Sequence, residues 1–359
     1  MNTAYFYLTP EGEALALRLS AGHPGDLYGK DNFRENLRTA FSRYENLICI
    51  MATGIVVRIL APLLVHKSSD PAVVVMDQKG RHAINLLSGH LGGANDLARE
   101  MAFLAGGEPV ITTATDVAGL LSFDTFAKSH EMAIENIREL KHVSGALLSG
   151  KPILVVTDCH FPEVEDLVSR KLASKVSVSD YVSNKSDRPS GKTDTKKEPE
   201  AKLPTVIIDE SLYADGLPGE GSEILVLRPR TICAGIGCKR GMDGESIIEA
   251  LSAVLKETGL APRSLEWIST IPLKADEPGI HAASAYFETP LKVISTEEIE
   301  KLDISSLGIA PSDFVAQQTG VLSVSAASSF LAAEKGLLLR DKVKFKGVTI
   351  ALSKHLKYS

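Results

Sequence analysis

The chain has 359 residues, which is enough for two or three domains that each bury a core. A formal net charge of −6 excludes broad non-specific binding to nucleic acid, which needs a basic surface. The four cysteines are scattered and form no zinc-binding pattern, no run approaches the ~18 apolar residues of a membrane span, and the amino terminus lacks a signal-peptide pattern. We therefore expect a cytoplasmic protein with reduced thiols, no metal site and neither nucleic-acid nor membrane partners.

Short β-branched apolar runs alternate with helical patterns along most of the chain. This alternation predicts a multi-domain α/β protein in three units, with parallel or mixed sheets flanked by helices and ligands near the carboxyl ends of the strands. The expected strands are Leu47–Ala52, Ala72–Met76, Val110–Thr113, Ile153–Thr157, Thr205–Ile208, Ile224–Leu227, Ile232–Ile236, Leu265–Ile271, Leu291–Ile294 and Val348–Leu352. The expected helices are Glu35–Tyr44, Ala94–Leu104, Phe161–Arg170, Asp243–Glu257 and Ser323–Lys335.

Two breaks in composition divide the chain. Residues 184–202 contain six Lys/Arg, four Asp/Glu and two prolines, with Ala201 as their only apolar residue. Such a segment cannot bury enough surface to offset its ordering entropy, so we expect a disordered insertion. A second boundary is expected near Pro229, which separates two apolar runs. The predicted domains are residues 1–130, a variable middle domain at 131–228 and a carboxyl-terminal domain at 229–359.

A glycine-rich loop followed by a helical pattern is the most informative motif. The run LLSGHLGGANDLAR (86–99) places Ser88, Gly89, Gly92 and Gly93 around His90. Backbone amides of such a loop and the start of the following helix favour an anion or a developing oxyanion. Polar residues of the next segment then extend the predicted small-molecule site: Thr112, Thr113, Thr115 and Asp116.

A second glycine-rich loop, in ICAGIGCKRG, follows a predicted strand and precedes a helix. Gly235, Gly237 and Gly241 are spaced GxGxxxG, one residue longer than the dinucleotide fingerprint. The acid expected at the end of the next strand is also missing, since Glu266 stands at its start. An anion-binding loop with Lys239 and Arg240 fits these residues better than a nucleotide site.

Three blocks together resemble the CbiG family of the anaerobic cobalamin pathway: Gly54–Ala98, Pro109–Asp124 and Leu227–Gly241. The carboxyl-terminal segments Ser269–Gly279, Gly320–Ala333 and Val348–Lys354 are similar to the family as well, whereas the likeness weakens between about residues 131 and 228. Two departures stand out, since Ala326 replaces a glutamate common in the family and the charged insertion is unusual.

The resemblance implies a hydrolase of cobalamin biosynthesis that acts on cobalt-precorrin-5A, a cobalt-bearing corrinoid. Water would open its ring-A δ-lactone, and carbon C20 would leave with its methyl group as acetaldehyde to give cobalt-precorrin-5B. Cobalt would arrive with the substrate, so no cofactor is expected. Two alternatives remain open: a non-catalytic carrier that passes corrinoid intermediates to other enzymes of the pathway, and a nucleotide-dependent enzyme that uses the second loop.

Lactone opening needs a base for water, a donor for the oxyanion and cations for a polycarboxylate. His90 is the first candidate for the base, although a loop histidine can also serve only to bind backbone or substrate. Asp116 is the second candidate or a helix N-cap, and Asp96 either takes part or stabilises its helix. The glycines supply amide donors or allow a tight turn. The candidates for the substrate's carboxylates are Arg58, Lys239, Arg240 and Lys274.

Overall fold

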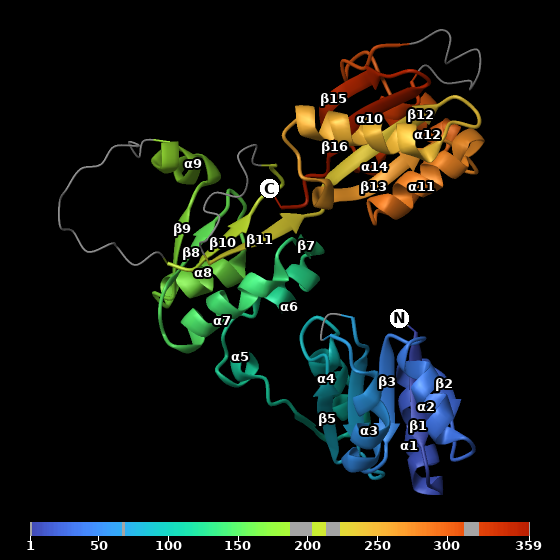
Figure 1. Ribbon diagram of the computed structural model, residues 1–359, viewed down its shortest axis with the longest axis vertical. Helices are drawn as coiled ribbons and strands as arrows, with labels where there is room; N and C mark the ends of the chain where they lie inside the picture. The colour runs from blue at the N-terminus through green and yellow to red at the C-terminus, as the bar shows by residue number, and fades with distance from the viewer. Residues whose placement is uncertain (1, 67–68, 187–202, 213–222, 312–322, 359) are drawn as a thin grey trace, which may run out of the picture. The chain divides into compact units, whose positions relative to one another are not determined.

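We describe the protein from a computed structural model, which covers residues 2–66, 69–186, 203–212, 223–311 and 323–358. The chain forms two compact units, residues 1–128 and 129–359 (Figure 1). The described residues build three mixed sheets flanked by helices, as the alternation of strand and helix patterns predicted. The division into domains at residues 130 and 228 stays a prediction.

The first unit is built on a six-stranded sheet with the order β2-β1-β3-β4-β5-β6. Its strands are β1 (Thr3–Tyr7), β2 (Asp26–Tyr28), β3 (Asn46–Ile50), β4 (Ala72–Met76), β5 (His82–Leu87) and β6 (Glu108–Val110). The helices of this part are α1 (Pro10–Gly22), α2 (Phe33–Phe41), α3 (Thr53–Leu60) with the 3-10 turn η1 (Ala61–Leu63), α4 (Ala94–Ala105), α5 (Ala114–Val117) and α6 (Phe123–Ser129).

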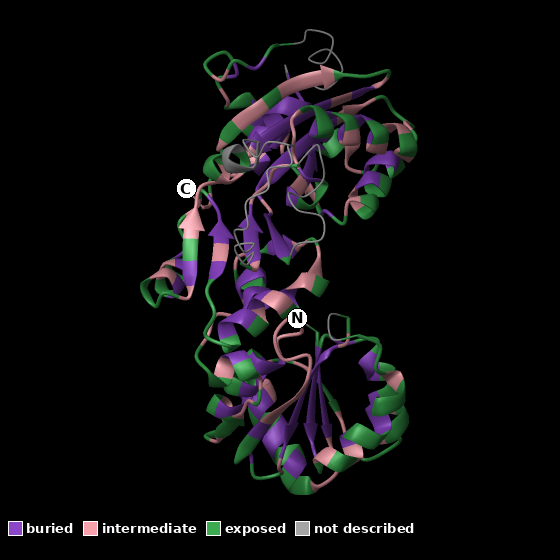
Figure 2. Ribbon diagram, turned by 60° about the vertical axis from the view of Figure 1, so that its left-hand side comes forward, coloured by how far each residue is buried: buried purple, intermediate pink, exposed green. Residues whose placement is uncertain are grey.

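Both faces of this sheet are covered, which explains why its central strands are almost wholly apolar (Figure 2). Helices α1 and α4 pack on the face that carries Tyr5, Ile48 and Val74. Helices α2 and α3 pack on the opposite face, beside Phe6 and Cys49. The run 54–64, which is apolar except for one arginine, forms most of α3 and the 3-10 turn η1 that follows it.

Strand β5 runs against the direction of β1–β4. Residues 77–81 connect β4 to β5 in a short turn, in which the Asp77 carboxylate accepts the amides of Lys79 and His82 at 2.9 Å each. So short a connection can join only antiparallel neighbours. The carboxyl end of β5, where the loop with His90 begins, consequently lies at the amino ends of β1–β4. No strand was predicted at His82–Leu87, so neither this strand nor its direction was expected from the sequence.

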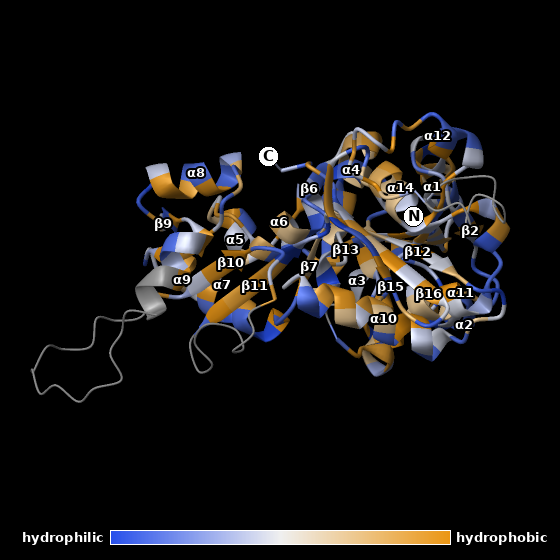
Figure 3. Cartoon of the chain, turned by 90° about the horizontal axis from the view of Figure 1, so that it is seen from above, coloured by the Kyte–Doolittle hydropathy of each residue, from blue (hydrophilic) through white to orange (hydrophobic). Residues whose placement is uncertain are grey.

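The second unit contains two sheets. The first has the order β7-β11-β10-β8-β9 and very apolar inner strands (Figure 3). Its strands are β7 (Met132–Ile134), β8 (Ile153–Val156), β9 (Ala173–Val176), β10 (Thr205–Ile208) and β11 (Ile224–Pro229). Its helices are η2 (Ile137–Glu139), α7 (Leu140–Leu148), α8 (Pro162–Ser169) and α9 (Val178–Ser186). Of the predicted insertion, residues 184–186 belong to α9 and the rest lie outside the described residues.

The other sheet of this unit has the order β14-β13-β12-β16-β15, with β16 antiparallel to both of its neighbours. Its strands are β12 (Ile232–Cys238), β13 (Leu265–Thr270), β14 (Leu291–Val293), β15 (Leu337–Lys344) and β16 (Val348–Lys354). Its helices are α10 (Gly244–Glu257), η3 (Pro262–Ser264), η4 (Pro272–Lys274), α11 (Pro278–Tyr286), α12 (Thr296–Glu300) and α14 (Ser325–Ala332).

The predicted elements differ from the observed ones mainly at their ends. The expected strand at Val110–Thr113 is wrong, because β6 ends at Val110 and Thr113 is already the N-cap of α5. Helix α2 lies at Phe33–Phe41, ahead of the expected Glu35–Tyr44. Within the described part of the chain, no helix combines the length and hydropathy needed to cross a membrane.

Candidate functional site

The loop between β5 and α4 is a compact turn that uses its own backbone groups. Ser88 and Gly93 both adopt left-handed conformations, with φ of 58° and 89°. The amides of Gly93, Ala94 and Asn95 donate to the carbonyls of His90, Ser88 and Gly89 at 3.0–3.1 Å. The amide of Gly93 is therefore not available to an oxyanion, which corrects the donor role predicted for this glycine.

Two of the loop glycines have little space beside them, and at Gly92 the nearest atoms include the backbone of Ser88. A Cβ atom at Gly92 would lie 2.3 Å from the Cβ of Ser88, and one at Gly89 would lie 2.9 Å from Oδ1 of Asn95. The hydroxyl of Ser88 donates to the carbonyl of Asp70 at 2.9 Å. These contacts favour the tight-turn alternative, in which the glycines and Ser88 shape the loop that carries His90.

His90 lies between two carboxylates. Its Nε2 atom is 2.8 Å from Oδ2 of Asp116, and its Nδ1 atom is 3.3 Å from Oδ2 of Asp124. The hydroxyls of Thr115 and Ser122 lie 3.3 and 3.2 Å from the same two nitrogens. The imidazole is 15% exposed, so it is sheltered but not sealed from solvent. The structure thus brings together three residues singled out from two separate motifs: His90, Thr115 and Asp116.

Asp116 is held by three donors. Arg99 approaches its Oδ1 atom at 2.6 Å, while the Asn95 amide and His90 each lie 2.8 Å from Oδ2. Asn95 is buried and itself accepts a hydrogen bond from Asn85. Since the N-cap of α5 is Thr113, Asp116 is not the N-cap that the alternative interpretation proposed. Its carboxylate is positioned for His90 instead.

The charges of this cluster support one another. The hydrogen bond to Asp124 raises the pKa of His90, with a smaller contribution from Asp116, and outweighs the opposing effect of burial. Burial by itself would raise the pKa of Asp124 and of Asp116, but hydrogen bonds from His90, Ser122 and Arg99 lower both pKa values on balance. The favoured state is an imidazolium between two carboxylates. A raised pKa makes a general-acid role available to His90, and the general-base role stays a prediction beside it.

The same shifts make stability depend on pH. The raised pKa of His90 adds stability that is fully present below its ordinary value of 6.5 and is lost as the pH rises through the folded-state pKa. The lowered pKa of Asp124 adds stability that is present above 3.8 and is lost as the pH falls through its folded-state pKa. We expect His90→Gln to destabilise the protein most between about pH 4 and 6.5, and progressively less above that range.

Urea unfolding of the wild type and of His90→Gln, measured from pH 4 to 9, checks this dependence. An Asp96→Asn variant serves as the control, because the Asp96 side chain is 71% exposed. A difference between wild type and His90→Gln that grows toward high pH would contradict the charged cluster.

The remaining predicted residues of the first unit lie at its margin. Asp96 pairs with Arg99 at 2.9 Å and touches the cluster only through that arginine. Thr113 lies 3.3 Å from the Asn95 amide, whereas Thr112 is exposed. Arg58 belongs to α3 and donates to the carbonyl of Gly54 at 2.9 Å. None of these contacts gives Asp96 or Arg58 a direct place beside His90.

The glycine-rich loop after β12 already holds a carboxylate of the protein. The amide of Gly241 donates to Oε2 of Glu277 at 2.9 Å, and Nζ of Lys274 lies 3.0 Å from Oε1. Glu277 is buried, and the Gly241 amide is the largest of the contacts that lower its pKa. Lys274 is therefore neutralised by Glu277, which conflicts with its predicted role toward substrate. Lys239 and Arg240 remain exposed.

The two other glycines of this loop differ in what surrounds them. A Cβ atom at Gly235 would lie 1.8 Å from the carbonyl oxygen of Ser325, the first residue of α14. At Gly237 the nearest atom is 3.8 Å away, an ordinary contact. Gly235 thus lets α14 pack on β12, and this packing accounts for its presence without a ligand.

Several site residues were missed by reasoning from the sequence: Asp124, Ser122, Asn95, Asn85, Arg99 and Glu277. Asp124 and Asn95 stand inside the quoted motifs, and each is a polar residue next to apolar neighbours that become buried. That pattern is the one local signal that could have drawn attention to them. The others are ordinary polar residues, and each makes a contact within the site with a group ten or more residues away in the sequence: Ser122 with His90, Asn85 with Asn95, Arg99 with Asp116 and Glu277 with Gly241.

Comparison with known proteins places the chain in a family. Three family models match in order: Cobalamin synthesis G N-terminal at residues 35–116, Cobalamin biosynthesis central region at 121–229 and Cobalamin synthesis G C-terminus at 232–353. A Salmonella typhimurium protein named cobalt-precorrin-5A hydrolase is 35% identical over 98% of this chain and 97% of its own length. A Priestia megaterium protein of the same name is 31% identical over 88% of this chain and 80% of its own length.

One solved structure spans the same length. The crystal structure of a cobalamin biosynthesis protein G homolog from Sulfolobus solfataricus covers 99% of this chain and 97% of that chain, with 20% identity and a TM-score of 0.37. The sequence relatives, which span nearly the whole chain and are named hydrolases, decide the assignment. The chain belongs to the cobalamin synthesis G family.

Proposed function

We propose that the protein is a cobalt-precorrin-5A hydrolase. The observation that carries this proposal is 35% identity, over 98% of the chain, to the Salmonella protein of that name. In the proposed reaction, water adds to the carbonyl carbon of the ring-A δ-lactone, and the ring oxygen leaves as a hydroxyl on C20. The bond between C20 and the macrocycle then breaks and leaves its electron pair on the macrocycle, which takes up a proton. C20 departs with its methyl group and oxygen as acetaldehyde.

In this scheme His90 acts as the acid, because its raised pKa favours the protonated ring. For the transfer, the lactone oxygen takes the place of one of the two carboxylates at a ring nitrogen. The partly exposed imidazolium then protonates this oxygen as the carbon–oxygen bond breaks. Asp116 and Asp124 stabilise the charged ring before the transfer and orient both of its nitrogens. Cobalt belongs to the substrate in this proposal, so the reaction requires no resident cofactor. The exposed cations Lys239 and Arg240 are the proposed contacts for the carboxylates of the macrocycle.

Anaerobic incubation of the purified protein with cobalt-precorrin-5A tests the proposal. The expected result is acetaldehyde in multiples of the enzyme concentration, with a corrinoid product whose mass equals substrate plus water minus acetaldehyde. Stoichiometric corrinoid binding without acetaldehyde would replace the hydrolase with the carrier alternative. Neither binding nor release would overturn both.

A further inference from the structure

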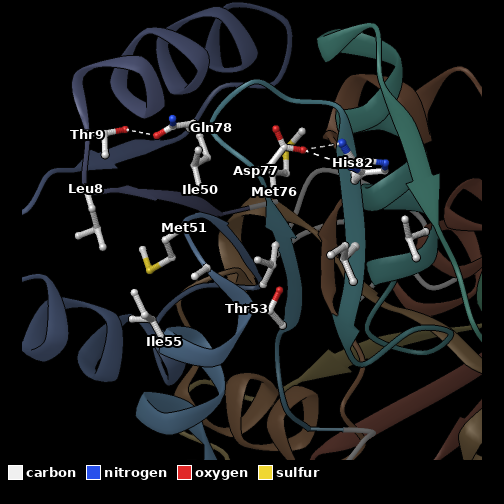
Figure 4. A pocket seen from close by; sticks show the side chains of 14 residues that line it. Leu8, Thr9, Ile50, Met51, Thr53, Ile55, Met76, Asp77, Gln78 and His82 are labelled. Carbon is white, nitrogen blue, oxygen red and sulfur yellow. Dashed lines mark hydrogen bonds and ion pairs between the residues drawn. The ribbon is translucent and has the colours of Figure 1, made fainter.

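A crevice opens at the edge of the first sheet opposite to His90. Strands β1 and β3 are parallel neighbours, but the chain leaves β1 toward α1 on one face and leaves β3 toward α3 on the other. In open α/β sheets this divergence creates the crevice in which ligands bind, outside the carboxyl ends of the strands. The structure has a cavity of about 660 Å³ at this point (Figure 4). Its lining contains residues that directly follow β1, β3 and β4 in the sequence.

The body of the cavity is apolar and its rim is polar. Ile50, Met51, Ile55, Met76 and Ile84 line it, while Thr9 and Gln78 meet at 3.1 Å on one side. Asp77 and His82 also belong to the lining, and their Oδ2 and Nδ1 atoms lie 3.5 Å apart, so the carboxylate at this side of the rim is paired. No lysine or arginine belongs to this described lining. A volume of this size and an apolar wall suit a ring system or part of one.

A cation and a helix start lie beside the rim. Nη1 of Arg58 is 2.9 Å from the carbonyl oxygen of Gly54, and the residues before and after Gly54 in the sequence, Thr53 and Ile55, belong to the lining. Among the described residues, no carboxylate forms an ion pair with Arg58, whose side chain is exposed. The N-cap of α3 is Ala52, which has no side chain able to accept the first amides of the helix. Both features favour one anionic group at this rim.

We propose that this crevice is a second corrinoid-binding site, in which an apolar edge of the macrocycle enters the cavity and one carboxylate arm pairs with Arg58. The choice of a corrinoid rests on the proposed function. A single guanidinium and an uncapped helix match one carboxylate and not the several charges of a nucleotide triphosphate. Because the crevice and His90 occupy opposite edges of one sheet, this site binds without reacting and serves the arrival or departure of the corrinoid.

Calorimetric titration with dicyanocobyrinic acid, a stable cobalt corrinoid with free carboxylates, tests the site. We expect saturable binding that Arg58→Gln weakens about 10-fold or more, as loss of a charge-assisted hydrogen bond predicts. The heptamethyl ester of the probe should bind to the wild type no more tightly than the acid binds to Arg58→Gln, and the substitution should not weaken the ester further. An ester that binds as well as the acid would overturn the carboxylate contact.

A pair of tryptophan variants on α3 tests the position. Ala52→Trp fills the mouth of the cavity and should abolish the Arg58-dependent binding. Val57→Trp is the matched control, since Val57 is 46% exposed on the same helix and is not part of the lining, and it should bind normally. Binding that survives Ala52→Trp would place the corrinoid elsewhere and refute the inference.

The inference and the proposed function fail in different ways. His90→Ala should lose turnover of cobalt-precorrin-5A and keep the Arg58-dependent binding of dicyanocobyrinic acid. If the protein shows this binding but forms no acetaldehyde, the second binding site is supported and the hydrolase proposal is refuted. If the protein instead forms acetaldehyde while Arg58→Gln and Ala52→Trp leave its binding of the probe unchanged, the proposed hydrolase is supported and the second binding site is refuted.

Discussion

Replacing His90 with alanine is expected to lower the turnover of cobalt-precorrin-5A by about two to four orders of magnitude. The variant removes the ring that Asp116 and Asp124 hold at 2.8 and 3.3 Å, and with it the proposed proton donor. Acetaldehyde release under anaerobic conditions measures the effect. Asp96→Asn is the matched control, because Asp96 is an exposed acid of the adjoining helix, and its turnover should stay within a few-fold of wild type.

The pH profile separates the two roles of His90. As an acid, His90 is active in its protonated form, so the rate should be level below its pKa and fall as the pH rises through it. The hydrogen bond to Asp124 raises that pKa above the ordinary 6.5, so the fall should begin above this value. Asp124→Asn should move the fall to lower pH. A wild-type rate that rises with pH across the same range would instead support the general-base role.

The second large effect is expected on folding. Gly235→Ala should destabilise the chain by about 3 kcal/mol or more, the upper range for inserting an atom into a packed interior. The new Cβ atom would lie 1.8 Å from the Ser325 carbonyl oxygen, and a backbone oxygen at the start of α14 cannot move without shifting that helix off β12. Urea unfolding of the full chain, together with the soluble yield, measures the loss.

Gly237→Ala is the control for this prediction. Gly237 lies two residues further along β12, where an added Cβ would meet its nearest neighbour at 3.8 Å. The free energy of unfolding of the Gly237→Ala variant should remain within about 1 kcal/mol of the wild-type value, since alanine also restricts the unfolded chain more than glycine does. Equal losses in both variants would show that the close approach of α14 to β12 does not decide stability.

Local patterns predicted some elements almost to the residue. The helix expected at Ala94–Leu104 is α4, Ala94–Ala105, because its apolar period and the glycines at both ends are signals within the segment itself. The strand expected at Ala72–Met76 is β4 with the same bounds, since an apolar, β-branched run between breakers suits a strand buried on both faces. Residue types in two motifs were also sufficient to select His90 and Asp116.

Contacts between distant segments decided the rest. The sequence by itself determined the family and the alternation of strands and helices, and it singled out His90 and Asp116, which lie 2.8 Å apart. Only the tertiary structure showed that β5 is antiparallel, that Asp124 faces His90 from the other side, and that Gly241 serves Glu277. Strand direction, the pKa of His90 and the partner of a backbone amide all depend on groups that are close in space and remote in sequence, where no local pattern records them.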